Sequence, residues 1–236
     1  MTQRPTAVLA ALDVEASALA RHLPRSNSTS PNMPIWEGTI ESEPVVVALT
    51  GIGKVAAAMA AQFICDSQRP QSLISIGLAG GVGGTEERGR LIVASGAVQH
   101  DFDARPIAKA RGELPDLDVT VFTADHAVAE RLRIAALKVV ERAQTVVTGL
   151  VLTGDQVIAS RDVRDGRLAD FPDGVCFDME TAAIAQVALQ NQVPWGALRI
   201  TSDSADETFN QHEVLGFGAA SAADLFDQVI ARFLSG

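Results

Sequence analysis

Short apolar runs alternate with amphipathic stretches along the chain, and polar residues or glycines follow most of the runs. Apolar runs of roughly 4–8 residues are typical of strands buried in a sheet. Apolar residues spaced three or four apart are typical of helices that cover such a sheet. The runs predict strands at residues 6–12, 72–76, 91–99, 145–152, 175–177 and 195–201, and a hairpin from residues 35–40 and 45–49.

Stretches with helical periodicity separate these strands. After the first strand, Asp13 is the predicted N-cap, and Val14, Ala18 and Leu19 recur at helical spacing. Because residues 100–118 carry two prolines and mixed charges, they are expected to form a surface excursion. Strands that alternate with helices predict an α/β fold with a mostly parallel central sheet covered on both faces. The further helices are predicted at residues 55–66, 125–142, 161–170, 179–190 and 212–234.

The composition narrows the class of protein. Hydrophobic residues make up 47% and charged residues 20% of the 236 positions, which excludes a disordered chain and predicts one domain over residues 1–236. No apolar run approaches the roughly 20 residues of a membrane span, and Asp13 and Glu15 interrupt the N-terminal apolar stretch before a signal-peptide core forms. Cys65 and Cys176 lie in apolar segments, as buried cysteines of a cytoplasmic protein do. The net charge of −10 disfavours nucleic acids and membranes as partners.

Polar residues and glycines gather where the predicted strands end. The carboxyl ends of parallel strands meet at one edge of a sheet, where ligands bind. Each carboxylate there also fits a structural role, because acidic residues stabilise helix N-termini and turns. Their joint placement is what favours a shared cleft. The residues concerned are Asp13, Glu15, Gly51, Gly53, Gly77 to Gly84, Asp155, Glu180 and Asp203.

Several familiar motifs do not match. The segment 51–56 reads G-x-G-x-x-A, but the next strand lacks the acidic residue that binds a ribose in dinucleotide sites, and Val55 replaces the Ser or Thr of a phosphate-binding Walker loop. The glycines at 77–84 enclose Leu78, which offers phosphate neither a charge nor a hydroxyl. No G-x-S-x-G elbow occurs, and the four histidines share no metal-ligand spacing. We therefore expect neither a metal nor an organic cofactor.

Six segments, in order, resemble the purine nucleoside phosphorylase and nucleosidase superfamily, and within it the methylthioadenosine/S-adenosylhomocysteine nucleosidases. The resemblance covers most of the chain. It implies a three-layer α/β/α fold, nucleoside phosphorylase/hydrolase-like, and cleavage of a purine N-glycosidic bond. The segments are residues 11–15 (ALDVE), 50–58 (TGIGKVAAA), 77–81 (GLAGG), 153–155 (TGD), 177–185 (FDMETAAIA) and 199–206 (RITSDSAD).

The chemistry of that reaction suits the carboxylates at the strand ends. Because the sugar becomes oxocarbenium-like, the enzyme has to protonate the departing base, bind the ribose and deliver a nucleophile. By resemblance, Asp203 beside Ser202 is the acid that protonates the purine N7, and Glu15 activates the attacking water. The resemblance also implies that Glu180 and Met179 bind the ribose, Ile52 lines the pocket for the 5′ substituent, and the Ile158 backbone contacts the purine edge.

Two positions depart from the resemblance. Leu78 stands where relatives carry Ser, and Val157 stands where a Phe stacks on adenine; Phe209 is the candidate to replace that ring. The leading hypothesis is hydrolysis of a purine nucleoside, 5′-methylthioadenosine or S-adenosylhomocysteine, that releases adenine. The alternatives are a phosphate-dependent phosphorylase on the same fold and a nucleoside-binding protein without catalysis. Relatives are oligomers, so a homo-oligomer is expected, with a dimer favoured.

Overall fold

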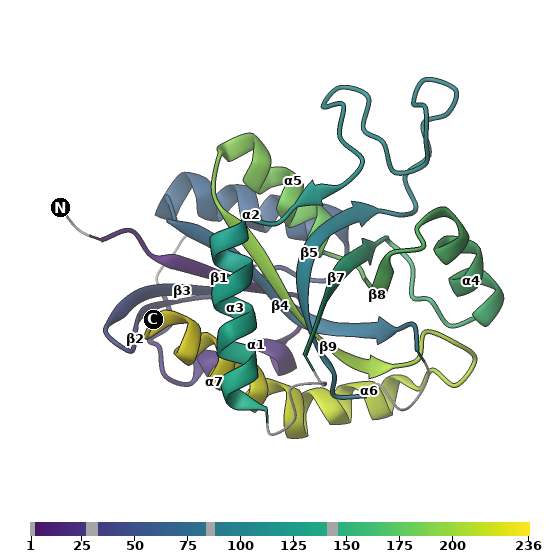
Figure 1. Cartoon of the computed structure of the whole chain (residues 1–236). Helices are drawn as coiled ribbons and strands as arrows, with labels where there is room; N and C mark the ends of the chain where they lie inside the picture. The colour runs from purple at the N-terminus through teal and green to yellow at the C-terminus, as the bar shows by residue number, and fades with distance from the viewer. Residues whose placement is uncertain (1–2, 27–32, 84–87, 141–145) are drawn as a thin grey trace.

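The computed structural model describes residues 3–26, 33–83, 88–140 and 146–236, in which nine strands form one sheet (Figure 1). The strands are β1 (Thr6–Ala10), β2 (Ile35–Ile40), β3 (Glu43–Leu49), β4 (Ser72–Gly81), β5 (Leu91–Gln99), β6 (Phe122–Thr123), β7 (Val146–Thr153), β8 (Gly174–Asp178) and β9 (Trp195–Asp203). The helices are α1 (Asp13–Ala20), α2 (Lys54–Gln68), α3 (His126–Val139), α4 (Arg161–Asp170), α5 (Thr181–Asn191), α6 (Gln211–Phe217) and α7 (Ala223–Leu234), with a π-helical turn, η3 (Gly218–Ala222), between the last two.

The sheet is mixed, and part of it closes on itself. Strands β3, β1 and β4 are parallel neighbours, and the hairpin partner β2 lies at the outer edge. Beyond β4 the strands form a ring, because β4 pairs with both β8 and β9, β7 pairs with β8 and β5, and β9 pairs with β5. The predicted central sheet is confirmed, whereas the ring is an addition that the sequence pattern did not predict.

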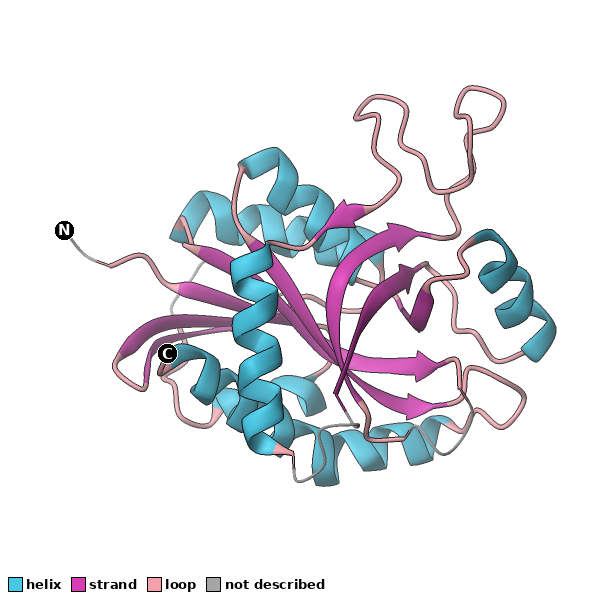
Figure 2. Cartoon of the chain, in the orientation of Figure 1, coloured by secondary structure: helices cyan, strands magenta, loops and turns pink. Residues whose placement is uncertain are grey.

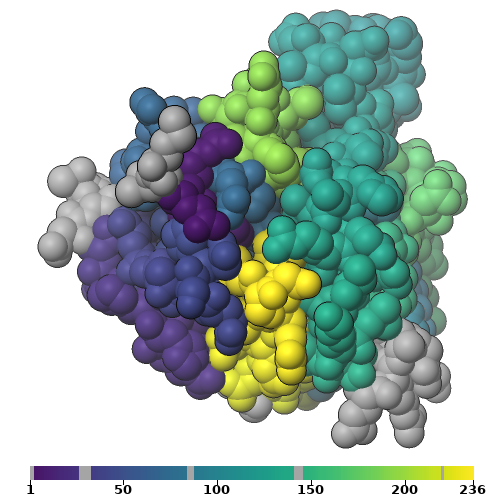
Figure 3. All heavy atoms as spheres, turned by 60° about the vertical axis from the view of Figure 1, so that its left-hand side comes forward, coloured from purple at the N-terminus to yellow at the C-terminus, as the bar shows by residue number. Residues whose placement is uncertain are grey.

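Helices cover both faces of the sheet (Figure 2). On one face α2 and α5 pack together, and their alanine-rich sides join a core that includes Ala57, Ile64 and Ala185. On the other face α1, α3 and α7 pack together around residues such as Leu132 and Phe226. Figure 3 shows the C-terminal helix, in yellow, between the hairpin region and α3. The three-layer α/β/α arrangement is therefore present.

Several predicted boundaries need correction. Asp13 is the first residue of α1, and Leu12 is its N-cap. Strand β4 continues through the predicted glycine loop as far as Gly81. Glu180 is the N-cap of α5, one residue before the helix. The predicted helix 212–234 is divided by the π turn η3. The predicted ends of a helix at 141–142 and of a strand at 145 lie outside the described residues.

The excursion after β5 begins in the core and then leaves it. His100 is fully buried, and its ring meets the Phe177 ring edge-on at a centroid distance of 5.5 Å. Burial lowers the pKa of His100 to about 4. Beyond it, residues 101–121 form no helix or regular strand and project from the sheet (Figure 1). Within the described ranges, no helix is both long and apolar enough to cross a membrane.

Candidate active site

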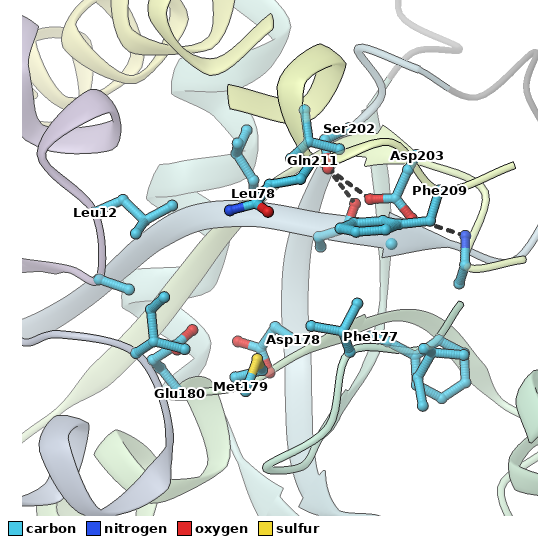
Figure 4. Close-up of a pocket in the computed structure, with 18 of the residues that line it drawn as sticks. Leu12, Leu78, Phe177, Asp178, Met179, Glu180, Ser202, Asp203, Phe209 and Gln211 are labelled. Atoms are coloured by element: carbon cyan, nitrogen blue, oxygen red, sulfur yellow. Dashed lines mark hydrogen bonds between the residues drawn. The ribbon is translucent and has the colours of Figure 1, made fainter. Parts of the chain in front are cut away.

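One cavity of about 400 Å³ opens at the carboxyl ends of the central strands. Figure 4 shows two facing walls: Asp203, Phe209 and Gln211 on one side, and the β8 end from Phe177 to Glu180 on the other. The cavity brings together residues that lie up to almost the whole chain apart. The residues to which the resemblance assigned a place in the site all line it, namely Glu15, Ile52, Leu78, Val157, Ile158, Met179, Glu180, Ser202, Asp203 and Phe209. Asp13, Gly51, Gly53 and Asp155, which the strand-end pattern also placed in the shared cleft, are not among the described residues that line it.

Glu15 is buried at the start of α1, and backbone N–H groups hold its carboxylate. Its Oε2 accepts hydrogen bonds from the amides of Ala11 (3.0 Å) and Leu12 (2.9 Å), and its Oε1 accepts one from Leu78 (2.8 Å). Burial raises the pKa of Glu15, although these bonds and the nearby charge of Arg199 oppose the shift. A carboxylate with a raised pKa and a fixed orientation is suited to accept a proton from water.

Glu180 lies at the end of β8, where it faces the cavity but is 8% exposed. Its Oε1 accepts a hydrogen bond from the Gly53 amide at 2.9 Å. Burial, with the neighbouring Asp178 carboxylate, raises the pKa of Glu180 to about 8, while Arg199 and the Gly53 amide oppose the shift. Its other oxygen makes no hydrogen bond to the described protein, so it is free to meet a ligand hydroxyl.

Arg199 is a buried cation beneath this cavity. It is 1% exposed. Its Nε donates a hydrogen bond to Asp178 Oδ2 at 2.9 Å, and its Nη2 forms a salt bridge with the same oxygen at 2.7 Å. Its Nη2 also donates to Ser75 Oγ and Thr181 Oγ1, both at 2.7 Å. Asp178 accepts further hydrogen bonds from the hydroxyls of Thr181 and Thr153. The pair is satisfied on both sides, as a buried ion pair must be to avoid a large desolvation cost.

Asp203 ends β9 on the opposite wall. Its Oδ2 accepts a hydrogen bond from Ser202 Oγ at 2.8 Å, and its Oδ1 accepts one from the Ala205 amide at 2.9 Å (Figure 4). The second bond is the Asx turn expected of this segment. Arg88 Nε donates to the Ser202 carbonyl at 2.7 Å, which secures the strand end. Asp203 therefore presents its carboxyl group to the cavity in one orientation.

The walls between the carboxylates are apolar. Ile158 is buried, whereas Val157 and Ile52 are 53% and 59% exposed at the mouth. The Leu78 side chain packs toward Gly218, where an added Cβ would meet its Cδ1 at 3.1 Å. Such a cavity suits a flat heterocycle and an apolar substituent, with few polar groups to orient them.

Two residues of importance were missed by the sequence reasoning. Arg199 lies between apolar residues of a buried strand, and a lone cation in such a run was the available signal. Gln211 lines the cavity from the first turn of α6, and its amide lies on the same side as Leu78, across from Glu180 (Figure 4). Nothing in the sequence around Gln211 distinguishes it from a surface residue at a helix start.

The described part of the chain contains no group of three or more His, Cys, Asp or Glu side chains placed to hold a metal ion. None of the described residues that line the cavity is Lys, Arg or His. The chemistry that the cavity offers is therefore carried by the carboxyl groups of Glu15, Asp178, Glu180 and Asp203 in an apolar setting. Proton transfer and stabilisation of a developing cation are the steps that such groups perform.

Comparisons with known proteins agree with this geometry. The model of the phosphorylase superfamily matches residues 5–235. A 5′-methylthioadenosine/S-adenosylhomocysteine nucleosidase of Anoxybacillus flavithermus is 31% identical over 205 residues, 86% of this chain and 87% of that protein. One from Haemophilus influenzae is 32% identical over 84% of this chain and 86% of that protein.

Solved structures show the same likeness. The nucleosidase of Neisseria meningitidis in complex with methylthio-immucillin-A has a TM-score of 0.90 and 28% identity, and the match covers 98% of this chain and 99% of that one. The nucleosidase of Streptococcus pneumoniae with a transition-state inhibitor has a TM-score of 0.88 and 27% identity, with 98% of each chain covered. The chain therefore belongs to the phosphorylase superfamily and, within it, to the 5′-methylthioadenosine/S-adenosylhomocysteine nucleosidases.

Proposed function

We propose that this chain is an N-glycosyl hydrolase that cleaves 5′-methylthioadenosine and S-adenosylhomocysteine and releases adenine. The observation that carries the proposal is the placement of Glu15, Glu180 and Asp203 around one apolar cavity. Relatives that bear this activity in their names are similar over most of the chain. The three carboxyl groups match the three requirements of the reaction, which are an acid for the base, a partner for the sugar and an activator for water.

Asp203 is the proposed acid. It donates a proton to N7 of the purine, so that the base leaves as a neutral molecule rather than as an anion. Ser202 and the Ala205 amide orient the carboxyl group, and Phe209 lies beside it in Figure 4. Phe209 supplies the aromatic face for the base in place of Val157, and the Ile158 backbone contacts the purine edge.

Glu180 and Glu15 are the proposed partners of the sugar and the water. Glu180 accepts hydrogen bonds from ribose hydroxyls, and Met179 packs against the ring. Glu15 takes a proton from the water that attacks C1′ as the glycosidic bond breaks. Three backbone amides fix Glu15, so the water is held on one face of the sugar.

Water rather than phosphate is the proposed nucleophile. A phosphate dianion is normally bound by cations, hydroxyls or several backbone amides. No Lys or Arg is among the described cavity-lining residues, and the amide of Leu78 is already bonded to Glu15. The apolar Leu78 side chain therefore disfavours the phosphorylase alternative.

The test is a product analysis with 5′-methylthioadenosine, adenosine and inosine, each with and without phosphate, with the base and sugar separated by chromatography. We expect adenine and a free reducing sugar without phosphate. Base release only with phosphate would show a phosphorylase, and no release from any nucleoside would favour a binding protein.

Asp203→Asn tests the acid directly. The variant is expected to abolish turnover while calorimetry still detects nucleoside binding. Asp206→Asn is the matched control, since Asp206 forms a similar turn with Thr208 two residues on and does not line the cavity. Near-normal turnover in Asp203→Asn would remove Asp203 from the acid role.

The protein is further proposed to be a cytoplasmic homodimer. Val55 and Met59 at the start of α2 are 70% and 69% exposed, and Ile52 continues this apolar surface to the cavity mouth. Such a surface on a helix is typical of a subunit interface. Light scattering tests the assembly: we expect a dimer that Met59→Glu converts to a monomer, and a monomeric wild type would contradict it. The cytoplasmic location rests on Cys65 and Cys176, which are buried and form no disulfide.

A further inference from the structure

Three loops that follow different strands meet beside Glu180 in a closed set of hydrogen bonds. The amide of Lys54, after β3, donates to Asp155 Oδ1 at 2.7 Å. The amide of Asp155, after β7, donates to Asp101 Oδ2 at 2.9 Å. Lys54 Nζ returns to Asp101 Oδ1, after β5, at 2.7 Å. We call these residues, Lys54, Asp101 and Asp155, the strand-end ring.

The strand-end ring does not touch the cavity itself. None of its three residues is among the described residues that line the cavity. The Lys54 and Asp101 side chains are 17% and 21% exposed, so the ion pair is largely shielded from water. Burial alone would raise the pKa of Asp101, but the bonds and charge of Lys54 and the Asp155 amide outweigh it and hold the pKa below its usual range. Asp101 therefore stays ionised and paired.

The ring reaches the cavity through one amide. Gly53 directly precedes Lys54, and its N–H donates to Glu180 Oε1 at 2.9 Å. Gly53 has a φ of 96°, a conformation that favours glycine, and an added Cβ would lie 3.0 Å from Asp155 Oδ1. Two consecutive amides thus point at two carboxylates, one in the strand-end ring and one in the site. The position of the Gly53–Glu180 hydrogen bond therefore depends on the Lys54–Asp155 hydrogen bond.

We propose that the strand-end ring is a positioning device for Glu180: it holds the Gly53 amide so that the Glu180 carboxyl group faces the sugar hydroxyls. Hydrogen bonds from a fixed backbone amide orient a carboxylate more narrowly than solvent does. The role of Glu180 toward the sugar rests on the proposed function. Lys54 and Asp155 lie in two of the segments that resemble the family, but the proposed catalytic steps assign them no role. The strand-end ring gives both residues a role.

The experiment compares variants of the strand-end ring on two substrates. Asp155→Ala removes the acceptor for the Lys54 amide, and Asp155→Asn restores an oxygen there. Asp103→Ala is the matched control, because Asp103 lies two residues after Asp101 but outside the strand-end ring, and it is paired with Arg105 at 2.6 Å and Arg111 at 3.2 Å. Each variant is assayed with 5′-methylthioadenosine and with its 2′,3′-dideoxy counterpart, which lacks the hydroxyls that Glu180 binds. Thermal unfolding verifies that each variant is folded.

For Asp155→Ala we expect kcat/KM for 5′-methylthioadenosine to fall about tenfold, with a smaller fall for the dideoxy compound. Asp155→Asn should recover most of the loss, and Asp103→Ala should behave as wild type. Equal losses on both substrates would overturn the proposal, because a general structural effect does not depend on the sugar hydroxyls. The same substrate-dependent pattern in Asp103→Ala would overturn it too.

Hydrogen exchange provides a readout that needs no turnover. The Gly53 and Lys54 amides should exchange slowly in wild type and Asp103→Ala, and about tenfold faster in Asp155→Ala. Unchanged exchange would show that the ring does not hold these amides. If the wild type cleaves neither nucleoside, the proposed function fails, and the exchange rates still decide whether the ring holds Gly53.

Discussion

Gly77→Ala would place one methyl group between Arg199, beneath the cavity, and Glu15, which lines it. A Cβ at residue 77 would lie 2.3 Å from Arg199 Nη1 and 3.0 Å from Glu15 Oε1. Heavy atoms of this kind pack at about 3.5 Å, so the guanidinium would have to move by about 1.2 Å. It has little freedom to do so, because hydrogen bonds to Ser75 and Thr181 and its pairing with Asp178 hold it.

Both activity and stability should fall. A misplacement of about 1 Å that is passed on to the reacting groups can lower the rate about 100-fold. Because the added Cβ lies against both Arg199 and Glu15, we expect a loss of that order in kcat/KM, measured by adenine release from 5′-methylthioadenosine. Overpacking of a buried site costs roughly 1–3 kcal/mol. For a chain of this size that corresponds to a fall in Tm of about 2–12 °C, measured by calorimetry.

Gly166→Ala is the matched control for that variant. Gly166 lies in α4, and an added Cβ there would meet nothing within 4 Å. Because alanine is a better helix former than glycine, this variant should be fully active and slightly more stable. Gly77→Ala with activity and Tm close to wild type would refute the reasoning, since the methyl group would then be accommodated without moving Arg199 or Glu15.

Three further substitutions test other parts of the cavity. Burial raises the pKa of Glu180 to about 8, so ionisation of this carboxyl destabilises the folded state of the wild type increasingly from pH about 4.5 to about 8. The Glu180→Gln variant lacks this ionisation, so the Tm of the variant minus that of the wild type should rise through that window and then level off. A Tm difference that does not change with pH would contradict this. Val157→Phe adds a ring at the mouth and should tighten adenine binding about tenfold by calorimetry; an unchanged Kd would show that the ring does not reach the base. Gln211→Leu removes a side-chain amide from the cavity lining. It should lower the kcat/KM ratio of adenosine to 5′-methylthioadenosine about fivefold, because a hydroxyl but not a methylthio group can form a hydrogen bond with that amide; an unchanged ratio would place Gln211 away from the 5′ group.

The sequence predicted the elements that depend on local pattern. Strand β5 and helix α4 begin and end at the predicted residues, since the apolar run and the Phe171-Pro172 stop define them locally. The predicted site residues line one cavity because strand ends of a mostly parallel sheet converge. The fold class was therefore accessible from the chain alone, and the family resemblance supplied ten of the residues that line the cavity.

What the sequence did not predict depends on contacts between distant segments. The glycines at 77–81 were expected to follow the strand 72–76, yet they continue β4. Glycine is needed there because other side chains occupy the space that a Cβ would take. At Gly77 that space is taken by Arg199 and Glu15, and at Gly80 by Ala205 and Asp203. The partners of Arg199 come from three other elements, so no local pattern could reveal them.

The closed part of the sheet, formed by β4, β8, β7, β5 and β9, has a consequence for the synthesis of the protein. Strand β9 closes the ring by pairing with β4 and β5, more than one hundred positions earlier in the chain. Until residues 195–203 leave the ribosome, β4 and β5 have open edges, which attract other strands. The nascent chain carries Glu15 from the outset but acquires Asp203 only with its last segment. A chain that terminates before residue 195 is therefore expected to lack the proposed acid and to expose strand edges that favour aggregation.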